Sequence, residues 1–262
     1  KQVMTNLGFC YKAIQHTTDN IRRVDRPCIA GTNSQVLIVE TFDGKKTVFR
    51  FNDRCVAHRN HDISQVLANH GVDVPQIKLH LYNGQYFETY PYVSGLTMQE
   101  YLDMGMTHQQ IQDNYATIAL QMKKIADIPV QNFQNIENKN CASVAQSNIV
   151  NKTHSWVLGQ FVKYGTKMLN YGPQSICHCD LTPRNIVLDD NMNLMTILDL
   201  NAVSVANINF SVAITGLSLE HNNLNKQDFY SVCNDVMPNR IHRQQIDIIE
   251  NICKLYFRCY VR

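Results

Sequence analysis

The sequence lacks the features that mark membrane, nucleic-acid-binding and disulfide-rich proteins. No apolar run approaches the roughly 20 residues that a membrane span requires, and no signal-peptide pattern opens the chain. Lysine and arginine number 24 against 22 acids, without a dense basic run, so nucleic acid is not an expected partner. The nine cysteines are odd in number and form no Cys-x-x-Cys pair, which favours reduced thiols. We therefore expect a cytoplasmic protein.

The first 90 residues instead contain the signals of an antiparallel sheet. Residues 35–40 and 47–51 are rich in strand-forming side chains, and Asp43-Gly44 between them favours a hairpin turn. Residues 77–81 alternate apolar and polar side chains, and Asn83-Gly84 predicts a turn into a returning strand at residues 85–90. Between the hairpins, residues 55–70 have helical spacing, ended by Gly71. This pattern predicts a small sheet interrupted by one helix.

The remainder of the chain is mainly helical in pattern. Thr97-x-x-Glu100 and Thr107-x-x-Gln110 are capping boxes, and helical spacing of apolar residues follows the second. A further long helix is predicted within residues 143–171. We therefore divide the chain into an N-terminal lobe at residues 1–90 and a helical C-terminal lobe at residues 91–262.

Three polar residues in the segment 176–199 are candidates for a catalytic centre. Asn185 begins an apolar strand, and a polar turn at residues 189–191 predicts that residues 194–198 run back antiparallel to it. Such a hairpin sets Asn185 and Asp199 side by side at its open end. Asp180 lies five residues before Asn185, close enough to present its carboxylate to the same space.

These residue types fit magnesium-dependent phosphoryl transfer. That reaction needs a carboxylate to orient and deprotonate the attacking hydroxyl, together with oxygen ligands for the Mg²⁺ that neutralises the phosphates. Asp180 suits the catalytic base, whereas Asn185 and Asp199 suit the metal. We interpret His178 as a scaffold residue whose imidazole hydrogen-bonds the loop or the metal-binding segment.

The run His178-Cys179-Asp180-Leu181-Thr182-Pro183-Arg184-Asn185, followed by Ile197-Leu198-Asp199, resembles the choline kinase and aminoglycoside phosphotransferase superfamily. The resemblance implies an α+β, bilobal, protein-kinase-like fold. Its N-lobe would be an antiparallel five-stranded sheet with one helix, and its C-lobe would be mainly helical. ATP would bind between the lobes, and the phosphate acceptor would be an alcohol group on a small molecule.

The resemblance also implies residues that bind the nucleotide. Arg50 falls where the family places a cation that grips the α- and β-phosphates, and Asp62 is the helix acid that would pair with it. Tyr90 and Tyr92 lie in the expected hinge between the lobes, where backbone groups would bind adenine. The loop expected to cover the phosphates consists of Gly31, Thr32, Asn33 and Ser34, and it has one glycine fewer than is usual in choline kinase relatives.

Several alternatives stay open on the sequence alone. A protein kinase is disfavoured because Asp199-Leu200-Asn201 replaces Asp-Phe-Gly and no Ala-Pro-Glu segment follows. A catalytically degenerate nucleotide-binding module is suggested by the reduced glycine loop and by Phe210-Ser211-Val212-Ala213, where relatives usually have Asp-Leu-Ala.

The acceptor is the least determined part of the hypothesis. Choline or a related amino alcohol is the favoured acceptor, with Phe229 and Tyr230 among the aromatic residues that could wall its pocket or simply pack in the core. An aminoglycoside or a sugar is the alternative.

Overall fold

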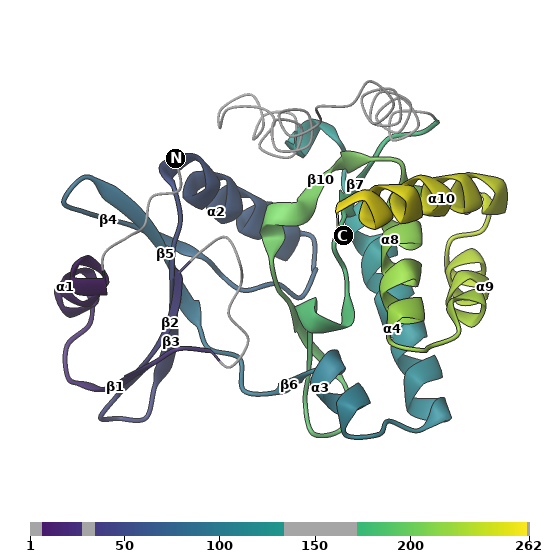
Figure 1. Ribbon diagram of the computed structural model, residues 1–262. Coiled ribbons are helices and arrows are strands. Elements are labelled where there is room, and N and C mark those ends of the chain that lie inside the picture. The colour runs from purple at the N-terminus through teal and green to yellow at the C-terminus, as the bar shows by residue number, and fades with distance from the viewer. Residues whose placement is uncertain (1–6, 28–34, 134–171, 261–262) are drawn as a thin grey trace.

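The computed structural model describes residues 7–27, 35–133 and 172–260 (Figure 1). The N-terminal part forms one antiparallel sheet in the strand order β1-β2-β3-β5-β4. In chain order its elements are α1 (Leu7–Thr17), β1 (Ile21–Asp25), β2 (Gln35–Thr41), β3 (Lys46–Phe51), α2 (Arg54–Asn69), β4 (Lys78–Tyr82) and β5 (Gln85–Pro91). The predicted five-stranded sheet is confirmed, and the structure adds helix α1 to the single helix that was expected.

Glycine-containing turns set the register of the two hairpins. At the β2–β3 turn Gly44 has a φ of 82°, and at the β4–β5 turn Asn83 and Gly84 have φ values of 45° and 77°. The β4–β5 turn therefore has positive φ at both central positions, as a type I′ hairpin turn requires, whereas the β2–β3 turn has it at Gly44 alone. Between the two hairpins, the antiparallel pairing of β3 with β5 places Arg50 directly opposite Glu88.

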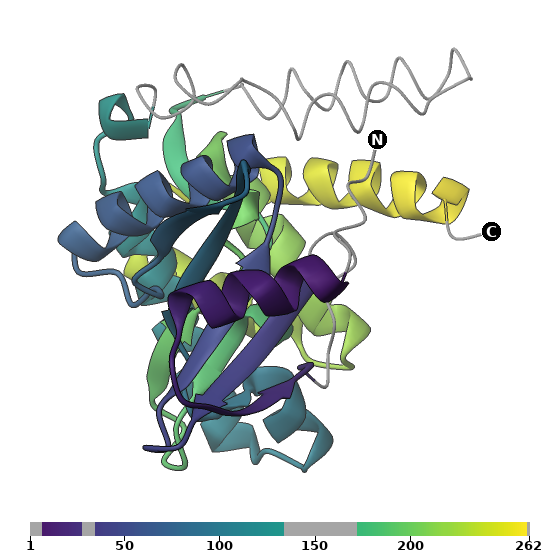
Figure 2. The ribbon, with the colours of Figure 1, turned by 90° about the vertical axis from the view of Figure 1, so that its left-hand side faces the viewer.

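The two faces of this sheet differ in chemistry. One face carries Phe49, Phe51 and Phe87, which pack with Ala13 and Ile14 of α1 in an apolar cluster. Figure 2 shows α1 lying across the sheet on the side that faces the viewer. Because side chains alternate along a strand, the neighbouring residues point to the opposite face, which is the one that helix α2 contacts.

Helix α2 begins and ends at the residues that its sequence indicates. The Asp53 side chain accepts a hydrogen bond from the Val56 N–H at 2.9 Å, which satisfies a backbone group that the first turn of a helix leaves open. Beyond its last residue, Gly71 adopts a φ of 72°. The helix is thereby held at a fixed length beside the sheet.

The C-terminal part combines helices with two small sheets, in the strand orders β6-β8-β9 and β10-β7. The two predicted capping boxes are present, at Thr97 with Glu100 and at Thr107 with Gln110. The helix predicted at residues 143–171 lies outside the described residues. The described elements are β6 (Leu96–Thr97), α3 (Met98–Asp103), α4 (His108–Ala126), β7 (Ser175–His178), η1 (Pro183–Asn185), β8 (Ile186–Leu188), β9 (Leu194–Ile197), η2 (Leu200–Ala202), β10 (Val203–Ala206), α8 (Ile208–His221), α9 (Lys226–Val236) and α10 (Arg243–Tyr260).

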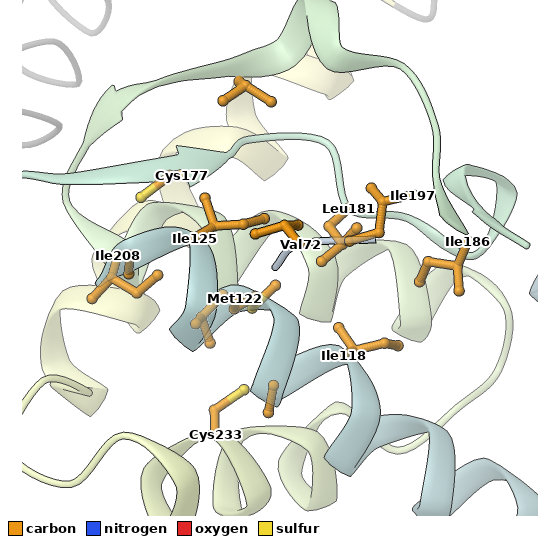
Figure 3. Packing of buried hydrophobic residues seen from close by; sticks show 14 of the residues in the cluster. Val72, Ile118, Met122, Ile125, Cys177, Leu181, Ile186, Ile197, Ile208 and Cys233 are labelled. Atoms are coloured by element: carbon orange, nitrogen blue, oxygen red, sulfur yellow. The ribbon is translucent and has the colours of Figure 1, made fainter. Parts of the chain in front are cut away.

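A large hydrophobic core fixes the strands and loops of this part (Figure 3). Helix α4 contributes Ile118, Met122 and Ile125, all nearly or fully buried. They belong to the same cluster as residues 177, 181, 186 and 197, which flank the polar residues of the candidate site. Among the described helices, none is long and apolar enough to cross a membrane.

Gly95 lies in the connection between the N-terminal sheet and the C-terminal part. A Cβ atom at this position would collide with the Leu188 carbonyl oxygen on β8 and press on the Val187 side chain. Glycine therefore allows the connecting backbone to pass close to the strand that follows Asn185.

Candidate active site

A hairpin brings Asn185 and Asp199 to the same place. Strands β8 and β9 are antiparallel, with Ile186 opposite Ile197. The pairing continues for one more residue, because the Leu198 N–H donates to the Asn185 carbonyl oxygen at 2.8 Å. Asp199 follows with φ 59° and ψ 59°, a left-handed conformation that is uncommon for residues other than glycine. Strained backbone of this kind concentrates at functional sites.

Asp180 lies on the loop between β7 and η1 and contacts Asn185. The Asn185 side-chain amide donates to the Asp180 carbonyl oxygen at 2.8 Å and to its carboxylate Oδ2 at 3.0 Å. This pair of hydrogen bonds closes the five-residue loop, and it gives the Asp180 side chain a defined position beside the hairpin end.

The surroundings of Asp180 disfavour its negative charge. Burial is the largest effect and the nearby Asp199 carboxylate adds to it, while the hydrogen bond from Asn185 acts in the opposite direction. Together they raise the pKa of Asp180 to about 6. A carboxylate with a raised pKa is a better proton acceptor than an ordinary aspartate, and it is still mostly ionised at neutral pH.

His178 acts as a scaffold for this loop. Its ring is buried, its Nε2 lies 2.9 Å from the Leu198 carbonyl oxygen, and the Asp180 N–H donates to its Nδ1 at 3.3 Å. These contacts require a neutral ring that is protonated on Nε2. Burial also lowers the pKa of His178, which keeps the ring neutral. His178 thus ties the Asp180 loop to the strand that ends in Asp199.

Two hydroxyl groups on α8 support the same loop, and sequence reasoning missed their role. Ser211 Oγ donates to the His178 carbonyl oxygen at 2.8 Å, and Thr215 Oγ1 donates to the Leu181 carbonyl oxygen at 3.0 Å. Both side chains are buried. Their four-residue spacing, which puts both hydroxyls on one helix face, was the available signal. Ser211 belongs to the segment that suggested degeneracy, yet it braces the catalytic loop.

Arg50 reaches the site from strand β3. Its Nη2 lies 2.9 Å from Asp199 Oδ1, and its side chain is only 12% exposed, whereas that of Asp199 is 39% exposed. Burial alone would lower the pKa of Arg50, but the charges of Glu88 and Asp199 outweigh it and the pKa is raised. The guanidinium is therefore a permanent positive charge at the point where the two parts of the chain meet.

Asp62 is not placed with this cluster. It lies on α2 two residues beyond Asn60, which corresponds to about half a turn of helix, and Asn60 is the residue that faces Glu88 on the sheet. The Asp62 carboxylate lies 3.1 Å from His61 Nδ1. The predicted Arg50–Asp62 pairing therefore does not match the structure, in which Arg50 pairs with Asp199 and lies opposite Glu88 in the sheet.

The two hinge tyrosines lie in different environments. Tyr90 shares the sheet face of Arg50 and Glu88, and burial raises its pKa to about 12. Tyr92 is exposed, its ring lies 5.8 Å from Lys46 Nζ, and its N–H donates to the Lys46 carbonyl oxygen at 3.0 Å. Tyr90 thus lies toward the site, whereas the Tyr92 N–H already has a backbone partner.

The remaining nucleotide-binding candidates cannot be placed. The loop formed by Gly31, Thr32, Asn33 and Ser34 lies outside the described residues. Its position in the chain, between β1 and β2, is known from the strands on either side.

The donor atoms at the hairpin end fit a magnesium ion. Asp199 offers a carboxylate and Asn185 an amide oxygen, the hard oxygen donors that Mg²⁺ prefers. In the described part of the chain, no group of three or more His, Cys, Asp or Glu residues could enclose a metal by itself. A site with one carboxylate and one amide suits a cation that takes its other ligands from phosphates and water.

Fold and site together define a class of kinase-like phosphotransferases. The five-stranded sheet supplies a cation, and the helical part supplies candidates for a base and two metal ligands. The sequence matches the model of the phosphotransferase enzyme family over residues 26–224. This match spans more than half of the chain, which therefore belongs to that family.

Solved structures share the fold at low sequence identity. An aminoglycoside 3′-phosphotransferase of type VIII aligns with a TM-score of 0.68 and 12% identity, covering 93% of this chain and 96% of the other. The GDP complex of an aminoglycoside 2′-phosphotransferase aligns at 0.67 and 15%, covering 97% and 91%. An ethanolamine kinase from Plasmodium vivax aligns at 0.63 and 14%, covering 96% and 83%. No curated protein sequence matches the chain.

Proposed function

We propose that this protein transfers the γ-phosphoryl group of ATP, bound with Mg²⁺, to a hydroxyl group of a small molecule. The observation that carries the proposal is the convergence of four side chains, three from residues 180–199 and one, Arg50, from a distant strand. Asp180 and Asn185 share two hydrogen bonds, Leu198 links Asn185 to the Asp199 segment, and Arg50 pairs with Asp199. Phosphoryl transfer relies on this kind of positioning and charge stabilisation.

Each residue has a distinct part in the proposed reaction. Asp180 orients the acceptor hydroxyl and takes its proton, which its raised pKa favours. Asn185 and Asp199 would hold Mg²⁺, which neutralises phosphate charge when bound. Arg50 would bind phosphate oxygens, for which its planar, permanently charged guanidinium is suited.

The nucleotide assignment rests on the fold and on this charge arrangement. A structural neighbour is a GDP complex, so nucleotide binding is a property of that neighbour. Arg50 and the metal-ligand pair offer two features that a nucleoside triphosphate needs, a cation for its phosphates and oxygen ligands for its magnesium ion. Both ATP and GTP belong in a binding test, with ATP as the proposed donor.

For the acceptor we propose choline or a related amino alcohol. The similarity to an ethanolamine kinase fold supports this class, as does the arginine at position 50, which is the choline-kinase variant of the family pattern. An aminoglycoside is the second candidate, because two of the aligned structures are aminoglycoside phosphotransferases. A sugar is the third.

The aromatic residues named as possible pocket walls do not decide between these acceptors. Phe229 is fully buried and Tyr230 is 3% exposed, so both are core residues of the helical part. Tyr230 donates its hydroxyl to Glu250, which also pairs with Lys226 at 2.7 Å. This buried network joins α9 to α10 and leaves no free aromatic face at these two positions.

The function is tested by measuring the consumption of nucleotide in the presence of Mg²⁺ and one candidate acceptor at a time. The candidates are choline, ethanolamine, aminoglycosides, amino sugars and simple sugars. Each reaction is repeated with Asp180→Ala, and phosphorylated product is identified by mass spectrometry. Product from one acceptor class that disappears in Asp180→Ala would support the proposal and name the class. Absence of both product and Mg-nucleotide binding would contradict it, and binding without any product would favour the degenerate module.

A further inference from the structure

Glu88 is a buried carboxylate for which no role follows from the family pattern. It lies on strand β5 and is 0% exposed. Its Oε1 accepts hydrogen bonds from the side-chain amides of Asn52 at 2.8 Å and Asn60 at 2.9 Å. Burying a carboxylate is costly unless charges and hydrogen bonds compensate for the lost water. The position therefore needs an explanation beyond packing.

The second oxygen of this carboxylate is not hydrogen-bonded. Glu88 Oε2 is buried and has no hydrogen-bond partner among the residues that the structure describes. Arg50 is directly opposite Glu88 in the strand pairing, on the same sheet face, where facing side chains come within reach of one another. Burial raises the pKa of Glu88 overall, and the positive charge of Arg50 counteracts part of this rise.

Two carboxylates of different character therefore lie near Arg50, and of these two only Asp199 forms an ion pair with it in the structure. Asp199 comes from the C-terminal part, is partly exposed and contacts the guanidinium at 2.9 Å. Glu88 comes from the neighbouring strand of the same sheet and is closed to solvent. If Asp199 held Mg²⁺, its charge would be shared with the ion and its attraction for Arg50 would weaken. Glu88 would then be the buried acid that remains near the guanidinium.

We propose that Glu88 is the positioning residue that holds Arg50 in the nucleotide site once Asp199 is committed to magnesium. The proposal rests on the proposed function, since it gives Arg50 the task of binding phosphates. In this protein the counter-ion of the phosphate-binding cation comes from strand β5, and helix α2 contributes the Asn60 amide to that carboxylate instead of an acid to the cation.

Helix α2 links this carboxylate to the other side of the site. Asn60 donates to Glu88, while its neighbour Arg59 donates to the carbonyl oxygens of Asn201, at 3.2 Å, and Val203. These two acceptor residues follow Asp199 in the chain. Through Asn60, the position of α2 is therefore expected to affect how firmly Glu88 is held, and with it the nucleotide affinity.

The first test is Glu88→Gln, which preserves shape and removes the charge. We expect the KM and the Kd for the Mg-nucleotide to rise about tenfold, with kcat changed less than about threefold. We also expect the Mg²⁺ concentration for half-maximal activity to rise, because Arg50 would compete more strongly for Asp199. Glu40→Gln is the matched control, since it removes an acid of the same sheet that pairs with Arg22 at 3.0 Å outside the site. It should leave all three quantities unchanged.

The second test moves the charge instead of removing it. In the double variant Asn60→Asp/Glu88→Gln, the acid and the amide exchange places across the same 2.9 Å contact. We expect it to recover most of the lost nucleotide affinity, measured by calorimetry without any acceptor. A residue with a purely structural role would lower Tm in both variants and would show no recovery of affinity.

The outcomes separate this proposal from the proposed function. Unchanged nucleotide KM and Kd in Glu88→Gln, in a wild-type background that turns over, would overturn the role of Glu88 and leave the kinase intact. If the wild-type protein turns over no acceptor, that result counts against the proposed function only. The nucleotide Kd values of wild type and Glu88→Gln then still decide the role of Glu88. If Glu88→Gln does not fold, Asn60→Ser serves in its place, with a KM rise of about twofold to threefold expected and no rise contradicting the proposal.

Discussion

The two faces of the five-stranded sheet come from the same strands and carry opposite chemistry. On β3 the residues Phe49, Arg50 and Phe51 alternate between them, so that the phenylalanines pack beneath α1 while the arginine enters the candidate site. The apolar face gains stability by burying hydrocarbon. The polar face buries charges at Arg50 and Glu88, which does not favour stability in general. We attribute its composition to the proposed nucleotide binding, and we expect the two faces to respond differently to substitution.

The largest effect should follow the loss of the proposed base. Asp180→Ala removes the carboxylate that accepts the proton, and general-base catalysis contributes about 10²–10⁴-fold to rate. We expect kcat to fall by about that factor in steady-state assays, with nucleotide affinity within about threefold of wild type. Turnover at the wild-type rate would contradict the mechanism.

The apolar face should show the reverse behaviour, in which stability changes and chemistry does not. Phe87 is nearly fully buried, and its ring centroid lies 5.4 Å from that of Phe51 and 6.0 Å from that of Phe49. Phe87→Ala should lower the free energy of unfolding by about 3–5 kcal/mol, as large-to-small core changes do. Denaturant unfolding measures the loss, and kcat of the folded fraction should be retained.

Phe42→Ala is the control for this experiment. Phe42 is 72% exposed in the turn between β2 and β3, so its removal should change the free energy of unfolding by less than about 0.5 kcal/mol. If Phe42→Ala and Phe87→Ala lowered the free energy of unfolding equally, the packing of Phe87 on the apolar face would not explain its loss.

A smaller effect should appear in stability at the site itself, with a defined pH dependence. The pKa of Asp180 is about 6 in the folded protein and about 3.9 in an unfolded chain, so the folded state holds the proton more tightly. Ionised Asp180 therefore destabilises the fold, and this penalty grows as pH rises from about 4 and is complete above about 6.

Asp180→Asn removes that penalty. Two pKa units correspond to about 2.7 kcal/mol, which partial solvent access reduces to about 1–2 kcal/mol. Without nucleotide or magnesium, the variant should exceed wild type in stability by that amount at pH 7.5, and the gain should disappear as pH falls toward 4. Urea unfolding at both pH values measures it. A gain that does not depend on pH would show that the charge is not responsible.

The smallest effect should come from the loop support on α8. Ser211→Ala removes one buried hydrogen bond to the His178 carbonyl oxygen and should cost about 1 kcal/mol in stability, with kcat reduced a few-fold. Ser218→Ala, on the same helix and partly exposed, is the control. A kcat for Ser211→Ala equal to that of the control would mean that this hydrogen bond does not position Asp180.

Local sequence signals were enough to predict most of the sheet and the catalytic hairpin. Asn83-Gly84 and Asp43-Gly44 each favour one turn geometry, and the run from residue 185 to 199 contains its own strand, turn and return strand. Those features depend on neighbouring residues only. Helix α1 was not predicted because its placement depends on a tertiary contact with Phe51 and Phe87.

The composition of the site was harder to predict for the same reason. Glu88 could have been found from strand register, since it is a charged residue opposite Arg50 in an otherwise uncharged strand. Asp62 was proposed from its position on α2 alone, without knowledge of which helix face meets the sheet. The structure places Asn60 on the face of α2 that meets the sheet, about half a turn from Asp62. The sequence pattern alone did not determine this rotation of the helix about its axis.

The most direct test of the account is calorimetric binding of ATP, with GTP in parallel, to wild type, Asp180→Ala and Asp199→Ala, each with and without Mg²⁺. We predict tight binding to wild type and to Asp180→Ala that depends on Mg²⁺, and a loss of this dependence in Asp199→Ala. Binding that is equally strong without Mg²⁺, or unaffected by Asp199→Ala, would contradict the assignment of Asp199 to the metal and with it the proposed phosphotransferase mechanism.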